Sequence, residues 1–123
     1  MVDDFHGPSE WASFMAGIER IVPGHTVIDL ENDHPMFHTV YDLAQRVRVP
    51  GYNVVRSGQV ERGGVDPRWR AILDDKGRVQ VAICFNMDLG DAWEFADAPD
   101  YPEEYASMAY KMGVNYILYA LTH

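Results

Sequence analysis

Hydrophobic side chains recur at helical spacing in two segments, one near each end of the chain. In the first segment, the repeating positions are Trp11, Phe14, Met15, Ile18, Ile21 and Val22. In the second, they are Tyr105, Met108, Ala109, Met112, Tyr116, Ile117 and Ala120. Apolar residues three and four positions apart form one face of a helix. The pattern therefore predicts helices over residues 9–22 and 103–121.

Three shorter apolar stretches predict strands. They cover residues 25–30, 69–73 and 78–85. Residues 74–77 (DDKG) include turn formers, so the last two strands are expected to form a β-hairpin. Residues 36–43 indicate a short helix, whereas residues 46–67 show no clear periodicity and predict a long irregular excursion.

Helices at both ends with strands between them predict an α/β domain. We expect a single domain over residues 1–123, because this length suits one hydrophobic core. Its central sheet is expected to be mostly parallel and flanked by helices, as in flavodoxin-like folds. The pattern shows about three strands, fewer than the four to six of a typical sheet. The chain is therefore expected to be either a compact partial domain or one that lacks N-terminal βα units.

The chain is acidic, with a formal net charge of −9. This charge argues against binding to nucleic acids and to anionic membrane surfaces, because both attract Lys and Arg. No apolar run approaches the ~20 residues of a membrane-spanning helix, and the N-terminus lacks the pattern of a signal peptide. The single cysteine, Cys84, lies in an apolar run and is predicted to be a buried, unreactive thiol.

Residues 86–94 (NMDLGDAWE) place three carboxylates and an amide directly after the apolar strand. Ligand sites in α/β sheets lie where strands end, so a polar site is expected here. Its candidate ligand-binding residues are Asn86, Asp88, Asp91 and Glu94, and the carboxylates also suit a hard cation. The alternative is that Asp91 and Glu94 cap a turn while Asn86 ties the loop to the backbone.

A second candidate lies at residues 3–7 (DDFHG), where a strand end meets a helix start. A helix N-terminus favours anions and lowers the pKa of a nearby histidine. His6 is therefore a candidate base or metal ligand, with Asp4 to orient it. The alternative is that Asp3 or Asp4 caps the helix and His6 bonds the backbone.

A third candidate is formed by His34, His38 and Asp42. On a helix these residues stand at i, i+4 and i+8, so they share one face and suit a divalent metal. The alternative is that His34 caps the helix and His38 is half-buried.

Four arginines surround a pair of glycines at positions 63 and 64. They are Arg56, Arg62, Arg68 and Arg70. Arginine binds carboxylate or phosphate with two parallel hydrogen bonds, which makes Arg62 a candidate ligand-binding residue. The alternative is that these arginines form ion pairs with Asp88 or Asp91.

Five motifs follow one another along the chain. They are residues 3–7 (DDFHG), 33–38 (DHPMFH), 62–64 (RGG), 86–94 (NMDLGDAWE) and 112–116 (MGVNY), with Thr122-His123 at the end. Together they resemble the bacterial DUF4159 family, a domain of unknown function, over essentially the whole chain. The resemblance implies further βα units upstream of Met1, so we expect the C-terminal portion of the family domain. It also implies export or membrane tethering, through a signal that would lie upstream.

More loosely, the order of elements is similar to the class I glutamine amidotransferase-like fold, including its trehalose-utilisation branch. This likeness concerns the fold and implies no function by itself. The nucleophilic cysteine of that fold is replaced here by residues 4–7 (DFHG), so the likeness does not imply amidotransfer.

These observations support three hypotheses, and whether the chain is an enzyme stays open among them. The leading one is a domain that binds a small polar ligand or a divalent metal. The second is a hydrolase, in which a bound metal activates water and His6 or Asp88 is the catalytic base. The third is a structural or interaction module, docked on an upstream half-domain or on a homo-oligomer partner.

Overall fold

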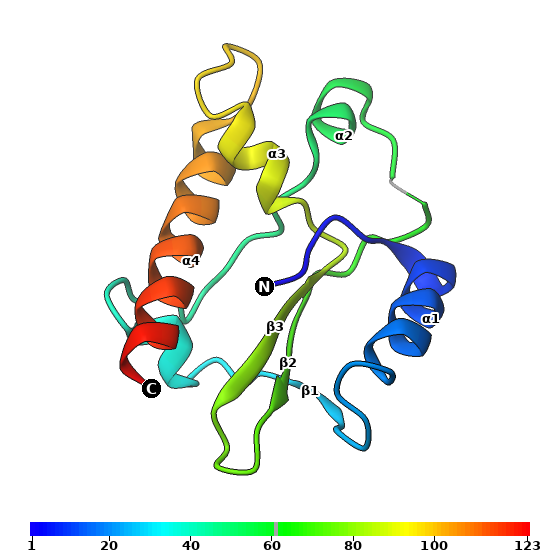
Figure 1. Ribbon diagram of the computed structural model, residues 1–123. Helices are drawn as coiled ribbons and strands as arrows, with labels where there is room; N and C mark the ends of the chain where they lie inside the picture. The colour runs from blue at the N-terminus through cyan, green and yellow to red at the C-terminus, as the bar shows by residue number, and fades with distance from the viewer. Residues whose placement is uncertain (61) are drawn as a thin grey trace.

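A small sheet stands between two helices in the computed structural model, which describes residues 1–60 and 62–123 (Figure 1). The elements in chain order are α1 (Gly7–Ile18), β1 (Val27–Asp29), the 3-10 helix η1 (Pro35–His38), α2 (Tyr52–Ser57), β2 (Arg68–Leu73), β3 (Val79–Phe85), α3 (Leu89–Glu94) and α4 (Glu103–Thr122).

The sheet has three strands in the order β1-β2-β3, and both neighbouring pairs are antiparallel. The predicted hairpin is present, with Arg68 opposite Phe85 and Ala71 opposite Ala82. The predicted mostly parallel, flavodoxin-like sheet is wrong. Parallel neighbours need a crossover connection, usually a helix. In the part of this connection that the structure describes, the chain between β1 and β2 forms η1 and the six-residue α2 and no longer helix, and it returns antiparallel.

One parallel contact does exist within the described ranges, and it involves the N-terminal segment. Val2 forms an isolated parallel bridge with Ile83 on the outer side of β3. The amide of Val2 donates to the carbonyl of Ala82 over 2.8 Å, and the amide of Cys84 donates to the carbonyl of Val2 over 2.9 Å. The strand end expected just before the first helix is therefore present only as this single bridged residue among those described.

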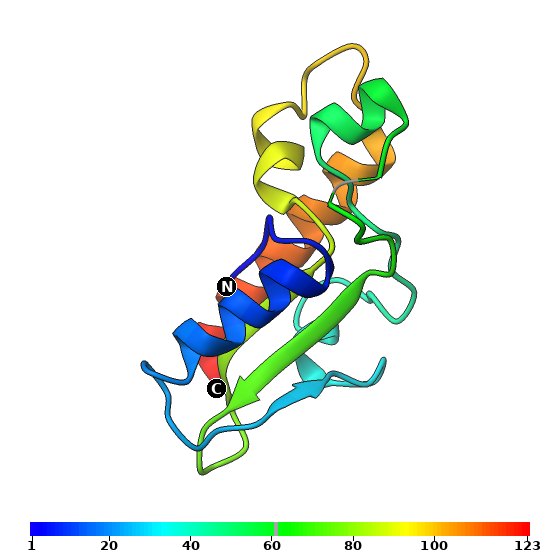
Figure 2. The same ribbon diagram turned by 90° about the vertical axis from the view of Figure 1, so that its right-hand side faces the viewer.

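The two faces of the sheet carry separate apolar clusters, because alternate residues of a strand point to opposite sides. On one face, Ile72 and Ile83 pack with Phe5 against α1. On the other, Ala82 and Cys84 belong to the larger core that α4 covers. Figure 2 shows α1 in front of the sheet and α4 behind it. Cys84 is fully buried, as predicted, and burial raises the pKa of its thiol to about 12.

Helices α2 and α3 lie beyond the carboxyl end of β3 (Figure 1). There α2 and α3 stand near the first turns of α4, and the ring of Tyr52 stacks on that of Phe95 at 4.1 Å between centroids. None of the helices in the described part of the chain combines the length and hydrophobicity that crossing a membrane requires.

Candidate functional site

The N-terminal segment brings the first predicted motif beside the acidic loop. Beyond Val2 it continues along the end of β3, where the amide of Asp4 donates to the carbonyl of Met87 over 3.0 Å. The amide of Asn86 donates back to the carbonyl of Phe5 over 3.1 Å. Residues 3–7 and 86–88, about eighty positions apart in the sequence, therefore lie side by side.

Asn86 joins three segments through its side chain, and we call this arrangement the Asn86 clamp. Its Oδ1 accepts a hydrogen bond from the amide of Gly7 over 2.9 Å, at the first residue of α1. Its Nδ2 donates to the carbonyl of Asp66 over 2.7 Å. Asn86 is 5% exposed and has a φ of 62°, a left-handed conformation that asparagine tolerates better than most residues. The clamp thus fixes the start of α1 and the loop before β2 to the end of β3.

Arg48 adds a second connection between these segments. Its Nε donates to the carbonyl of Asn86 over 2.9 Å, and its Nη2 donates to the carbonyl of Gly64 over 3.2 Å. No sequence pattern indicated this role, because Arg48 lies in the stretch without periodicity.

Two of the acidic side chains cap helix α3. Asp3 Oδ2 accepts hydrogen bonds from the amides of Leu89 over 2.8 Å and Gly90 over 3.1 Å. Asp88 Oδ1 accepts one from the amide of Asp91 over 2.8 Å. The first amides of a helix lack partners within it, and a carboxylate there also interacts favourably with the helix dipole. These contacts anchor the short helix to the N-terminal segment.

Asp91 has a similar role for the next helix in space. Its Oδ2 accepts a hydrogen bond from the amide of Tyr52, the first residue of α2, over 2.8 Å. Glu94 is exposed at the end of α3. The predicted ion pairs of Asp88 or Asp91 with an arginine do not occur among the described contacts.

Asp88 lies in an unusual electrostatic setting. It is 6% exposed, and burial raises the pKa of its carboxyl group from its ordinary value of 3.8 to about 7. The hydrogen bond from the amide of Asp91 acts in the opposite direction, and the charges of Asp91, Asp4 and Asp3 raise the pKa further. Desolvation dominates because a buried carboxylate loses the solvation that stabilises its charge.

The raised pKa of Asp88 predicts that stability falls as the pH rises from about 4 to about 7. The folded chain holds this proton more tightly than the unfolded chain, so the contribution is complete below pH 3.8 and is lost as the pH passes about 7. We expect a loss of roughly 2–4 kcal/mol in the free energy of unfolding. Thermal melts across this pH range measure it.

The matched variant for this prediction is Asp88→Asn, which keeps a side-chain oxygen for the cap but cannot titrate. Its stability should fall less over the same pH range, whereas Asp97→Asn, an exposed carboxylate, should behave like the unmodified chain. The same pH dependence in Asp88→Asn and the unmodified chain would show that another group is responsible.

His6 and Arg62 lie at the start of α1. His6 is 1% exposed, and its backbone amide donates to Glu10 Oε2 over 2.8 Å. Arg62 Nη1 donates to the other oxygen of Glu10 over 2.7 Å, and its Nη2 lies 3.5 Å from Asp4 Oδ1. The hydrogen bond from Arg62 holds the pKa of Glu10 below its ordinary value. Glu10 thus connects the backbone of His6 to Arg62, which also reaches Asp4.

A cavity of about 370 Å³ opens between these segments, and we call it the polar cleft. It is lined by Gly7, Pro8, Trp11, Gly63, Gly64, Val65, Asp66, Arg70, Phe85 and Asn86. The guanidinium carbon of Arg70 lies 4.4 Å from the ring centre of Trp11, and its Nε donates to Asp29 over 2.9 Å. Trp11 was expected only as a core residue, because its spacing fits the apolar stripe of the helix.

The residues predicted to bind a metal lie elsewhere, in and beside η1, which packs against α4. His34 Nδ1 accepts a hydrogen bond from the amide of Met36 over 3.2 Å, so it caps η1. His38 places one ring nitrogen 3.1 Å from Asp42 and the other 2.9 Å from the carbonyl of Asn32.

No group of three or more His, Cys, Asp or Glu side chains within residues 1–60 and 62–123 is arranged to hold a metal ion. The assignment of a metal to His34, His38 and Asp42 therefore stays a prediction that receives no support from the structure.

Comparison with known proteins gives one match, to the family described as Domain of unknown function (DUF4159), over residues 1–121. No curated protein and no solved structure matches the chain.

Proposed function

The chain belongs to the DUF4159 family of domains of unknown function, so its function has to be inferred from its own site, and we propose that it binds a small polar ligand in the polar cleft. The ligand class that fits best carries a carboxylate or phosphate group. The proposal concerns binding and includes no chemical step.

The observation that carries this proposal is the convergence of three distant segments on one cavity. Residues 7–8, 63–66 and 85–86 line it together, and the Asn86 clamp holds them in place. Three non-glycine residues close by, Asp4, Arg62 and Asn86, adopt positive φ values of 54°, 45° and 62°. Such conformations cost energy and are frequent at ligand sites, where the surrounding structure enforces them.

The chemistry of the lining supports an anionic group on the ligand. Arg70 offers guanidinium donors beside the apolar ring of Trp11. An arginine binds carboxylate or phosphate through two parallel hydrogen bonds, and the ring can pack against an apolar part of the same molecule. The pair of Arg70 with Asp29 is partly exposed, at 21% and 57%, so exchanging that partner for a ligand costs little. A volume of about 370 Å³ lies in the range of small-molecule sites.

The same contacts argue for binding rather than hydrolysis. Asp3 and Asp88, two of the acidic groups expected at the site, accept hydrogen bonds from helix amides and so serve as caps. His6 is almost fully buried, at 1% exposure. None of the three is among the residues that line the polar cleft.

The proposal predicts that Arg70→Gln weakens ligand binding by at least about tenfold, because it removes a charge-assisted contact worth roughly 1.5–3 kcal/mol. The measurement is a thermal-shift screen with inorganic phosphate, sugar phosphates and small carboxylates, followed by calorimetric titration of the best binder. The glutamine keeps a polar side chain of similar length. A loss of affinity in Arg70→Gln would therefore show that the guanidinium group contributes to binding.

Arg78→Gln is the matched control, because it removes the same charge from the hairpin, where Arg78 pairs with Asp74. Binding should persist in this variant. The absence of any binder in the screen, or a ligand held equally by Arg70→Gln and the unmodified chain, would overturn the proposal.

A further inference from the structure

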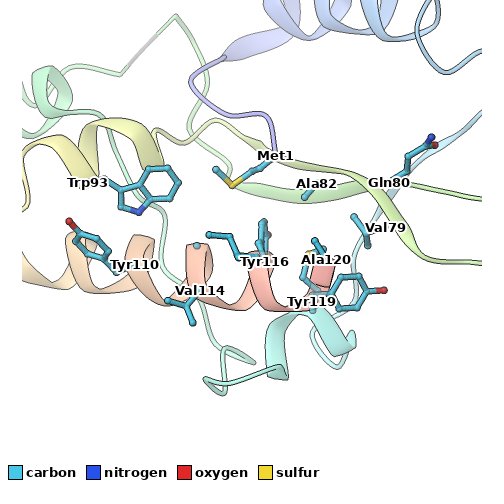
Figure 3. A pocket seen from close by; sticks show the side chains of 13 residues that line it. Met1, Val79, Gln80, Ala82, Trp93, Tyr110, Val114, Tyr116, Tyr119 and Ala120 are labelled. Atoms are coloured by element: carbon cyan, nitrogen blue, oxygen red, sulfur yellow. The ribbon is translucent and has the colours of Figure 1, made fainter. Parts of the chain in front are cut away.

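A second cavity lies on the opposite face of the sheet from the polar cleft, between β3 and α4. Its volume is about 480 Å³, and we call it the apolar groove. Figure 3 shows Met1 and Ala82 on one side of it and side chains of α4, including Tyr116 and Val114, on the other. The ring of Trp93, from α3, stands at one end.

The described residues that line the apolar groove include no Asp, Glu, Lys or Arg. This is unexpected in a chain with 29 such residues and a net charge of −9. The last twelve residues of the chain, most of them in α4, contain none either. A helix face that stays in water normally carries charged side chains.

A stripe of exposed apolar side chains runs along α4, and all of its residues except Leu121 also line the groove. It consists of Tyr110, Val114, Ile117 and Leu121, with exposed fractions of 52%, 37%, 63% and 75%. Their spacing of four, three and four residues is that of the a and d positions of a coiled coil, by which helices pack on one another. Between the large residues, Gly113 and Ala120 also line the groove. The ring of Trp93 packs against Gly113, whereas the small side chain of Ala120 leaves room for a side chain from a partner.

We propose that this face of the chain is a homodimer interface, in which α4 of one copy packs into the apolar groove of a second copy. A row of large apolar residues that forms one wall of an uncharged groove can pack into the same groove of a second copy, as an interface between identical copies requires. The charge distribution points the same way. Two chains of net charge −9 repel each other across their acidic surfaces, and this face is one on which they can meet without bringing like charges together.

A small apolar ligand or a membrane fits these observations less well. A small molecule in the groove would leave Leu121, which does not line it and is 75% exposed, uncovered. An anionic membrane surface would repel the acidic chain. A second copy covers both the groove and the stripe.

The experiment is sedimentation equilibrium of the full chain from low micromolar to near millimolar concentration. We expect the mass to rise from 14.0 kDa towards that of a dimer. Ile117→Glu places a carboxylate in the proposed interface, where it would be buried against apolar side chains. It should raise the dissociation constant of the dimer at least about 100-fold. Ile117 is 63% exposed in the single chain, so the variant should fold normally, which circular dichroism checks.

Ile21→Glu is the matched control, because it makes the same change at a residue that is 75% exposed, beyond the end of α1 and away from the groove. It should dimerise like the unmodified chain. The proposal is wrong if the unmodified chain stays monomeric at every concentration. It is also wrong if Ile117→Glu leaves the dimer intact, or if the two variants weaken it equally.

Discussion

Asn86→Ala is expected to lower the free energy of unfolding by about 3 kcal/mol. The substitution removes both hydrogen bonds of the clamp and leaves the amide of Gly7 and the carbonyl of Asp66 without their partner. Each buried group that loses its partner costs about 1 kcal/mol or more. Alanine must also adopt the φ of 62° without a side chain that tolerates it, which adds about 1 kcal/mol.

Urea denaturation measures this loss, and a second variant separates its two causes. Asn86→Gly removes the same hydrogen bonds but accepts a positive φ, so it should cost about 1 kcal/mol less than Asn86→Ala. Asn53→Ala, an exposed asparagine in α2, should stay within about 0.5 kcal/mol of the unmodified chain. Equal losses for Asn86→Ala and Asn53→Ala would mean that the clamp does not stabilise the fold.

The elements that the sequence predicts best are those specified by local pattern. The helix expected over residues 103–121 is found at Glu103–Thr122, because its apolar stripe repeats over about four turns. The hairpin is found because turn formers separate two apolar runs. The first helix ends at Ile18 rather than at residue 22, and Ile21, which continued the stripe, is 75% exposed.

The short helices could not be predicted, because their stability comes from residues far away in the sequence. Helix α3 is anchored by the carboxylate of Asp3, and α2 by that of Asp91. A six-residue segment has too few turns to show a period, and helices this short depend on tertiary contacts. The direction of strand pairing was missed for a related reason, since it depends on the path of the whole connection between β1 and β2.

The sequence indicated two of the segments that meet at the candidate site, although not the contacts between them. Polar residues after an apolar strand and at a helix start indicated two segments, and these do lie side by side. The alternative that Asp91 and Glu94 cap a turn of the acidic loop is not what the structure shows, because Asp3 and Asp88 cap α3 and Asp91 instead accepts a hydrogen bond at the start of α2. The contributions of Arg48 and Asp66 rest on side-chain-to-carbonyl bonds across 38 and 20 residues, for which the sequence has no local signal.

Gly64→Ala is expected to lower the free energy of unfolding by a similar amount, about 3 kcal/mol. A Cβ at this position would overlap Asn86 Oδ1 and would lie 2.7 Å from the amide nitrogen of Gly7. Neither neighbour can move freely, because the two are joined by a hydrogen bond and Asn86 is also held by Asp66. The methyl group therefore has to break the clamp or displace the loop.

A double-mutant cycle tests whether the loss in Gly64→Ala arises from the clamp. With Asn86→Gly as the background, the overlapping side chain is gone, so Gly64→Ala should cost only about 1 kcal/mol there. Gly17→Ala is the control, because nothing lies within 4 Å of a Cβ at this position in α1. It should raise stability by up to about 1 kcal/mol, as alanine does inside a helix. If Gly64→Ala lowered the free energy of unfolding equally in both backgrounds, the strain would lie in the backbone of the loop. The shape of the polar cleft would then depend on the backbone around Gly64 rather than on the side chain of Asn86.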